Sequence, residues 1–146
     1  AGKKINGRKR HILVDTLGLL LAVVVHSAAI QDRDGAKLVF FKAAASFPTI
    51  TLVWADGGYA GKLVEWLQRW CDWVLEIVRK LEGQVGFQVL PKRWLVERTF
   101  AWLGHSRRLS KDYEELVENS EAMIQIAMIR LMLQRLSQPP RPKQRR

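Results

Sequence analysis

Alternation of apolar and polar positions near the start of the chain predicts a β-hairpin. Residues 8–14 alternate and include β-branched side chains, residues 15–18 (Asp-Thr-Leu-Gly) are typical of a turn, and residues 19–26 are densely apolar. A strand without alternation is expected where both faces of a sheet are covered. The hairpin is therefore predicted to have a second strand that is buried on both faces.

Four more elements are predicted before residue 80, and they alternate between helix and strand. Asp32 or Asp34 is the expected N-cap of the first helix, and Pro48 follows its end. The order β-β-α-β-α-β implies a sheet covered by helices, with parallel crossover connections. The predicted elements are a helix over 32–46, a strand over 49–55, a helix over 61–70 and a strand over 73–78.

Two further helices are predicted after a loop at residues 79–90. Pro91 suits the first turn of a helix that runs to about Arg108. The last helix starts between residues 112 and 120 and runs to about residue 136. Its start is acidic and its end is basic, which suits the helix dipole. From residue 123 to residue 133 it is apolar nearly all round, so it is expected to need burial on more than one side.

The apolar run at residues 17–30 follows a basic stretch and superficially matches a secretory signal peptide. Asp15 and His26 flank or interrupt the run, the segment at 15–18 is typical of a turn, and residue 1 is not Met. The run is also shorter than the roughly 20 residues of a membrane span. We therefore expect an intracellular protein with no membrane association, and secretion remains as the alternative, with cleavage expected near Ala28 or Ala29.

Positive charge is concentrated at the two ends of the chain. Of 146 residues, 24 are Lys or Arg and 14 are Asp or Glu, and the ends at 1–10 and 137–146 carry nine of the ten net charges. Residues 92–111 are basic again, with six bases and one acid, Glu97. This asymmetry favours contact with nucleic-acid phosphates over tails that are merely solvated. A single Cys excludes a disulfide framework and a Cys-rich zinc site.

Two carboxylates stand out as candidate chemistry. Asp56 ends a predicted strand and precedes Gly57 and Gly58, a place where open α/β sheets bind ligands, although an Asp in a strand-to-helix turn is the ordinary alternative. Glu97 is either a carboxylate aimed from a helix into a basic cleft or a surface Glu paired with Arg93. Together they match the oxygen ligands that Mg²⁺ takes in phosphodiester cleavage, with basic groups holding the strand.

Three stretches resemble the insertion-sequence-five family of bacterial transposases, a family of the DDE type. The hairpin segment at 2–18 reads GKKINGRKRHILVDTLG. The segment at 54–61 reads WADGGYAG and resembles the one that bears the second catalytic Asp. The segments RWLVERTFAWL at 93–103 and RRLSKDY at 107–113 resemble the one that bears the catalytic Glu. The likeness covers roughly residues 2–136, with the motifs in the family's order.

The resemblance implies an α/β fold with an RNase H-like mixed sheet flanked by helices and a long C-terminal helix. It implies that three carboxylates bind two Mg²⁺ (or Mn²⁺) ions, with Asp56 as the second carboxylate and Glu97 as the third. The family's first Asp lies on a central strand that would precede residue 1. The expected organisation is a truncated catalytic domain at 1–136 and a basic, Pro-rich tail at 137–146.

Further expectations follow for the partners of this chain. An upstream transposase segment would supply the first Asp, and the chain is expected to form a homo-oligomer on insertion-sequence ends and target DNA in the bacterial cytoplasm, associated with the nucleoid. Arg93 matches the Arg of the family's Tyr-Arg-Glu-Lys signature, whereas Leu90 and Gly104 occupy the Tyr and Lys places. The candidate DNA-binding residues are Lys9, Arg10, Arg93, Arg98, Arg107, Arg108 and Lys111.

Two functions are therefore expected from different classes. The first is DNA transposition by Mg²⁺-dependent strand cleavage and transfer, with this chain inactive until the first Asp is supplied. The alternative is a catalytically inactive, DNA-binding remnant of a transposase.

Overall fold

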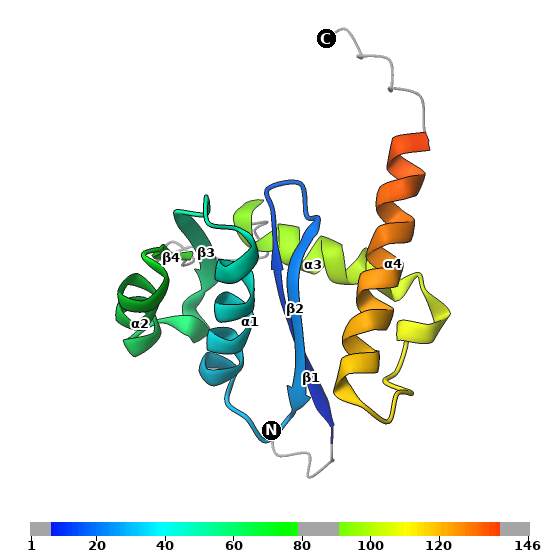
Figure 1. Ribbon diagram of the computed structural model, residues 1–146, viewed down its shortest axis with the longest axis horizontal. Coiled ribbons are helices and arrows are strands. Elements are labelled where there is room, and N and C mark those ends of the chain that lie inside the picture. The colour runs from blue at the N-terminus through cyan, green and yellow to red at the C-terminus, as the bar shows by residue number, and fades with distance from the viewer. Residues whose placement is uncertain (1–6, 79–90, 138–146) are drawn as a thin grey trace, which may run out of the picture.

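The computed structural model describes residues 7–78 and 91–137, except for the side chains of residues 91–93. The predicted loop at 79–90, most of both basic ends, Leu90 and the side chain of Arg93 lie outside the described residues. The order β-β-α-β-α-β is confirmed in the part before residue 79 (Figure 1). The elements are β1 (Arg8–Val14), β2 (Leu20–Ser27), α1 (Asp32–Ser46), β3 (Leu52–Asp56), the 3₁₀ turn η1 (Gly57–Tyr59), α2 (Lys62–Cys71), β4 (Val74–Val78), α3 (Pro91–Gly104), the 3₁₀ turn η2 (Arg107–Leu109) and α4 (Val117–Ser137).

The predicted hairpin forms from β1 and β2, which pair in antiparallel register with Arg8 opposite Ser27. Asp15 organises the turn because its Oδ1 accepts hydrogen bonds from the backbone N–H groups of Leu17 and Leu19, both at 2.8 Å. Gly18 completes the turn with a φ of 80°, a conformation in which glycine has no steric penalty. Asp15 is therefore a structural turn residue.

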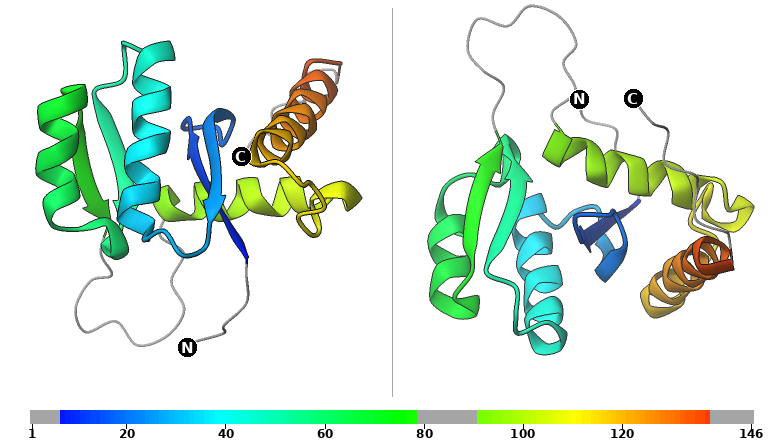
Figure 2. Two further views of the ribbon diagram at one scale, coloured as in Figure 1. Left: turned by 60° about the horizontal axis from the view of Figure 1, so that its bottom comes forward. Right: turned by 90° about the horizontal axis from the view of Figure 1, so that it is seen from above.

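The strands form two separate two-stranded sheets in the described residues, where the resemblance implied one mixed sheet that lacks its central strand. The hairpin is one sheet, and β3 and β4 form the other as a parallel pair joined through α2, as predicted. Within the described part of the chain, β1 bonds only to β2 and β3 bonds only to β4. Each strand consequently keeps one unpaired edge in the described residues, and Figure 2 shows the two pairs apart, with α3 running past both.

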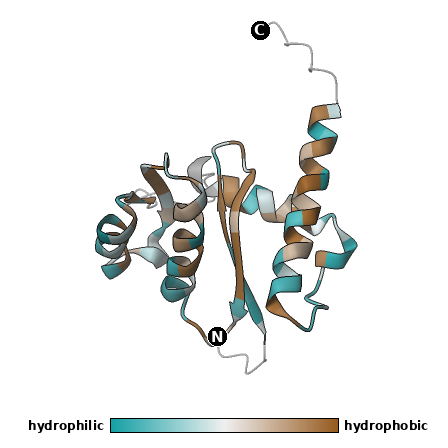
Figure 3. Ribbon diagram, in the orientation of Figure 1, coloured by the Kyte–Doolittle hydropathy of each residue, from teal (hydrophilic) through white to brown (hydrophobic). Residues whose placement is uncertain are grey.

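Two apolar clusters cover the two faces of the hairpin. On one face, Ala22 and Leu13 pack with α1, α2 and the β3–β4 pair, so that α1 joins both sheets into one core. On the other face, Val23 and Val25 pack against η2 and α4. Adjacent residues of β2 are thus buried on opposite faces, which confirms the prediction for the second strand. Figure 3 shows this strand as apolar along most of its length, up to its polar C-terminal end.

Local details of three helices differ from the sequence expectations. Gln31, rather than Asp32 or Asp34, is the N-cap of α1, and its side chain makes no capping hydrogen bond. The Asp32 carboxylate pairs instead with Lys9 at 2.9 Å. Helix α3 ends at Gly104, and the predicted continuation to Arg108 is the separate turn η2. Helix α4 buries one side only. Among the helices in the described ranges, none is both long and apolar enough to span a membrane.

Candidate functional site

Asp56 stands at the carboxyl end of β3 and turns the chain into η1. Its backbone is extended, and its Oδ1 accepts a hydrogen bond from the N–H of Gly58 at 2.9 Å, so the carboxylate is the N-cap of the turn. The side chain is exposed. A carboxylate held by its own backbone at the end of a parallel strand has a fixed direction while it remains accessible to a ligand.

The turn after Asp56 rests on a layer of aromatic rings. Tyr59 meets the ring of His11 edge-on, with centroids 6.5 Å apart and 3.5 Å between its Oη and His11 Nδ1. His11 in turn stacks on His26, with centroids 4.8 Å apart. On the α1 side, Arg33 donates a hydrogen bond from Nε to the carbonyl of Gly58 at 3.2 Å. The hairpin and the first turn of α1 therefore both support η1.

The two stacked histidines are buried, and the Nε2 atom of each has no hydrogen-bond partner in the described part of the chain. Burial, followed by the neighbouring His26, lowers the pKa of His11 below its ordinary value of 6.5. Burial and the carboxylates of Asp32 and Asp56 raise the pKa of Tyr59. His26 is therefore a core residue, and the charge of Asp56 affects Tyr59.

Glu97 lies on the exposed side of α3, the helix that contacts both β1 and β3. Its neighbour Thr99 is fully buried and donates from Oγ1 to the carbonyl of Gly18 at 2.7 Å, which fixes α3 to the hairpin turn. Arg98 donates to the carbonyl of Leu17 at 2.9 Å. The helix is thus anchored on the hairpin by the residues that follow Glu97, while Glu97 itself faces outwards.

Asp56 and Glu97 supply oxygen donors, which suit Mg²⁺ or Mn²⁺. Among the described residues, no three His, Cys, Asp or Glu side chains lie together in a way that could hold a metal ion. The donor type therefore fits a hard divalent cation, and the number of donors does not complete a site. Any further oxygen ligands must come from water, a third carboxylate or a substrate phosphate.

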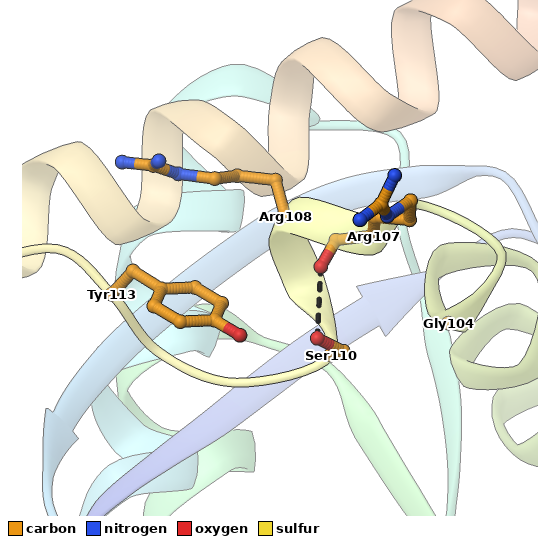
Figure 4. A pocket seen from close by; sticks show the side chains of 5 residues that line it. All are labelled: Gly104, Arg107, Arg108, Ser110 and Tyr113. Atoms are coloured by element: carbon orange, nitrogen blue, oxygen red, sulfur yellow. Dashed lines mark hydrogen bonds between the residues drawn. The ribbon is translucent and has the colours of Figure 1, made fainter.

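A basic hollow of about 620 Å³ lies beyond the C-terminal end of α3 (Figure 4). The Arg108 guanidinium is held by Glu114 at 2.7 Å and lies over the ring of Tyr113, 5.8 Å from its centroid. The Ser110 hydroxyl donates to the carbonyl of Arg107 at 2.8 Å. The hollow is lined by Gly104, Arg107, Arg108, Ser110 and Tyr113.

The other candidate DNA-binding residues lie in different surroundings. Lys9 donates to the carbonyl of Ile30 at 2.8 Å in addition to its ion pair with Asp32. Arg10 donates to the carbonyl of Leu109 at 3.0 Å. The guanidinium of Arg98 is sandwiched between the rings of Trp94 and Trp102, at 4.8 and 4.7 Å from their centroids. Lys111 is exposed and directly follows Ser110, which lines the basic hollow. Their DNA contacts stay predictions.

Sequence analysis did not single out four residues that shape these surfaces. Tyr59 could have been selected from the sequence, since it follows Asp56 within one short run of turn residues. Its ring connects η1 to the hairpin through His11. Ser110 and Tyr113 lie in the segment quoted for its resemblance, yet only their arginine neighbours were selected. Gly35 gave no local signal, because its role depends on two histidines that are distant in sequence: a Cβ there would lie 2.1 Å from His26 Nε2.

Comparisons with known proteins are consistent with this arrangement. A family model described as a transposase DDE domain matches residues 1–132. A protein of Burkholderia cepacia, inferred to be a transposase for insertion sequence element IS402, is 28% identical over 128 residues. That alignment covers 82% of this chain, and the chain spans 60% of the relative's length. No solved structure matches the chain.

Proposed function

The chain belongs to the transposase DDE domain family, and on that premise we propose that it carries the second and third catalytic carboxylates of an insertion-sequence transposase. The observation that supports this most is the placement of Asp56, an accessible carboxylate held at the carboxyl end of a parallel strand within the matched residues. Glu97 is the partner carboxylate, because its helix packs across the strand that Asp56 ends. The proposed reaction is cleavage and transfer of DNA strands at insertion-sequence ends.

The proposed cofactor is Mg²⁺ or Mn²⁺, held by Asp56 and Glu97 together with ligands from outside the described residues. Such an ion would activate the attacking oxygen and stabilise the leaving one. The residues of this chain would position the ion and the DNA strand. The Gly58 N–H and the Tyr59 ring fix the turn that carries Asp56, while Arg33 holds the same turn through the carbonyl of Gly58.

The proposed partner is an upstream transposase segment, which supplies the first Asp on a central strand of the sheet. The unpaired edges of β1 and β3 favour this arrangement, since a strand placed between them would convert the two sheets into one. Helix α3 contacts both of these strands and would lie across the added strand. Such a sheet would have the RNase H-like form expected from the resemblance, and residues 1–136 would then be one part of that domain.

The proposed substrate contacts are made by the basic residues around η2 and α3. Arg107 and Arg108 line a hollow that also presents hydroxyl groups, a combination suited to phosphate oxygens. The full set comprises Lys9, Arg10, Arg93, Arg98, Arg107, Arg108 and Lys111. A protein acting on chromosomal DNA would reside in the bacterial cytoplasm with the nucleoid. Membership of the insertion-sequence-five subfamily is part of the same proposal.

A strand-nicking assay tests this function. Chain 1–146 alone should show no Mg²⁺-dependent nicking of insertion-sequence ends, and a fusion to the upstream segment should nick them. In the fusion, Asp56→Asn and Glu97→Gln should each reduce nicking at least 100-fold. The matched controls Asp34→Asn and Glu65→Gln, both at exposed carboxylates, should retain it. Unchanged nicking by Asp56→Asn would refute the site assignment.

The second candidate is a catalytically inactive DNA-binding remnant. It is favoured by the basic hollow at η2 and by the incomplete set of metal donors in the described residues. In that case the fusion would bind the same DNA without nicking it. Binding would then depend on the basic residues alone and would be unaffected by Asp56→Asn.

A further inference from the structure

Helix α4 has two apolar faces on opposite sides. Ile124 and Met128 are 1% and 2% exposed and pack into the cluster on β2 and η2. At 3.6 residues per turn, Ile126, Ile129 and Leu133 point the other way. Their side chains are 57%, 54% and 60% exposed. The sequence predicted burial on more than one side of this helix, and the described residues bury only one.

The exposed face is a continuous stripe rather than scattered apolar residues. Its members are separated by four, three, four and three positions, which is the spacing of a two-helix coiled-coil seam. Soluble monomers rarely expose an apolar surface of this length without a partner. The stripe consists of Ala122, Ile126, Ile129, Leu133 and Leu136.

No charged residue interrupts the stripe, because the nearby cations turn towards α3. The Arg135 guanidinium lies over the Trp102 ring, 4.1 Å from its centroid. Arg130 lines a small hollow with Trp102 and His105, on the buried side of α4. The C-terminal end of α4 extends beyond the hairpin turn in Figure 1, and Leu136 near that end is 81% exposed.

We propose that two copies of the chain associate by antiparallel pairing of α4 along this stripe. A twofold pairing centred on Ile129 places Ala122 of one copy opposite Leu136 of the other, and the same patch serves both copies. The helix dipoles favour the antiparallel direction, because antiparallel packing places the negative end of one α4 beside the positive end of the other.

The size of the stripe is sufficient for a weak but specific dimer. It spans about 21 Å at 1.5 Å per residue. Burying five such side chains on each copy removes on the order of 1,000 Å² in total, at the lower limit for specific interfaces. We therefore expect association in the micromolar range. The pairing identifies an interface for the expected homo-oligomer. This proposal rests on the exposed apolar stripe of α4 and is independent of the catalytic assignment.

Sedimentation equilibrium of chain 1–146 over a concentration series tests the association. The wild-type chain should dimerise, whereas Ile129→Glu and Leu133→Glu should weaken association at least 30-fold with an unchanged far-ultraviolet circular dichroism spectrum. Phe41→Glu is the matched control, since Phe41 is 65% exposed on α1, and it should dimerise like the wild type. A monomer at all concentrations, or dimerisation unchanged by Leu133→Glu, would overturn the proposal.

Cysteine cross-linking tests the direction of pairing. In a Cys71→Ser background, Ala122→Cys and Leu136→Cys should form few disulfides alone and a mixed disulfide when combined. Efficient cross-linking of Ala122→Cys to itself would instead show a parallel pair and overturn the antiparallel arrangement.

Discussion

At the scale of single residues, the stacked pair His11 and His26 is the most unusual feature of the core. Both rings are buried, and each leaves one nitrogen without a partner in the described residues. The pair is tolerated because Gly35 has no side chain where the two Nε2 atoms lie. It also supports Tyr59 and thereby the turn that follows Asp56. Small changes here should therefore affect stability and the proposed site together.

Stability should fall as the pH drops below about 6.5. Because the folded pKa of His11 is lowered, the unfolded chain binds a proton that the folded chain resists. The contribution of His11 to the free energy of unfolding is fully present above the ordinary pKa of 6.5, and it is lost as the pH falls towards the lower pKa of the folded chain. The groups facing this ring are His26, Asp32, Lys9 and Tyr59, and only Asp32 opposes the shift.

Urea unfolding between pH 4.5 and 8 measures this effect. His11→Phe should flatten the pH dependence between the two pKa values, while His105→Phe, at an exposed histidine, should leave it unchanged. A wild-type unfolding free energy that rises between pH 6.5 and 5.5 would contradict the assignment.

Gly35→Ala should destabilise the chain by about 1–3 kcal/mol, a typical cost of overpacking. The added Cβ would lie 2.1 Å from His26 Nε2 and 2.5 Å from His11 Nε2, so the stack has to move. Gly104→Ala is the control, because nothing lies within 4 Å of the Cβ it would add. Thermal unfolding compares the two, and equal melting temperatures would show that the stack yields at no cost.

At the scale of elements, one arginine connects the hairpin to the segment before α4. Arg8 donates to the carbonyl of Glu114 at 2.8 Å and to Ser120 Oγ at 3.1 Å, and it pairs with Asp112 at 3.4 Å. Burial alone would raise the pKa of Asp112, but hydrogen bonds from Ser120 and the Glu114 N–H, together with Arg8, hold it below its ordinary value. The segment before α4 is therefore fixed onto β1.

Arg8→Ala should lower the free energy of unfolding by about 2 kcal/mol, because hydrogen bonds to charged groups contribute about 1.5–3 kcal/mol. Lys37→Ala removes only an exposed pair with Asp34 and should cost about 0.5 kcal/mol or less. Urea titration of both variants gives the comparison. An Arg8→Ala loss no larger than that of Lys37→Ala would mean that this connection adds nothing.

Element identity could be predicted from the sequence wherever the pattern is local. The alternation at residues 8–14 and the helical spacing at 32–46 correspond to β1 and α1 with the expected bounds. The N-cap of α1 could not be predicted, because Asp32 is drawn to Lys9 from a distant strand. The end of α3 also differs from the prediction, because the helix ends at Gly104 and residues 107–109 form the separate turn η2.

At the scale of the whole molecule, only some of the basic side chains are free to contact a partner, because others bind groups of the chain itself. Arg8 and Arg10 hold backbone carbonyls of the chain itself, and Lys9 is paired with Asp32. Arg107 and Lys111 are exposed near the basic hollow. Sequence could identify the basic segment but not which cations are engaged internally, because the contacts of Arg8 and Arg10 join residues 106 and 99 positions apart. The division of the strands into two sheets was equally invisible, since strand pairing is a long-range property.

DNA affinity should therefore depend on η2 and its neighbours. Arg107→Ala and Lys111→Ala should each weaken binding uniformly across sequences and reduce the salt slope of log K by about 0.9. Arg69→Ala, at an exposed position on α2, should change neither quantity. Fluorescence anisotropy at several salt concentrations measures both, and an unchanged slope in Arg107→Ala would remove this residue from the contact surface.

The central claim is that Asp56 and Glu97 bind the same divalent cation. Titration of the isotope-labelled fusion of chain 1–146 to the upstream segment with Mn²⁺, followed by amide NMR, tests this most directly. The account predicts that Mn²⁺ broadens amide signals around both residues at one apparent affinity, that excess Mg²⁺ reverses the effect, and that Asp56→Asn abolishes it at both segments. Broadening at only one segment, or broadening that persists at Glu97 in Asp56→Asn, would contradict a shared site.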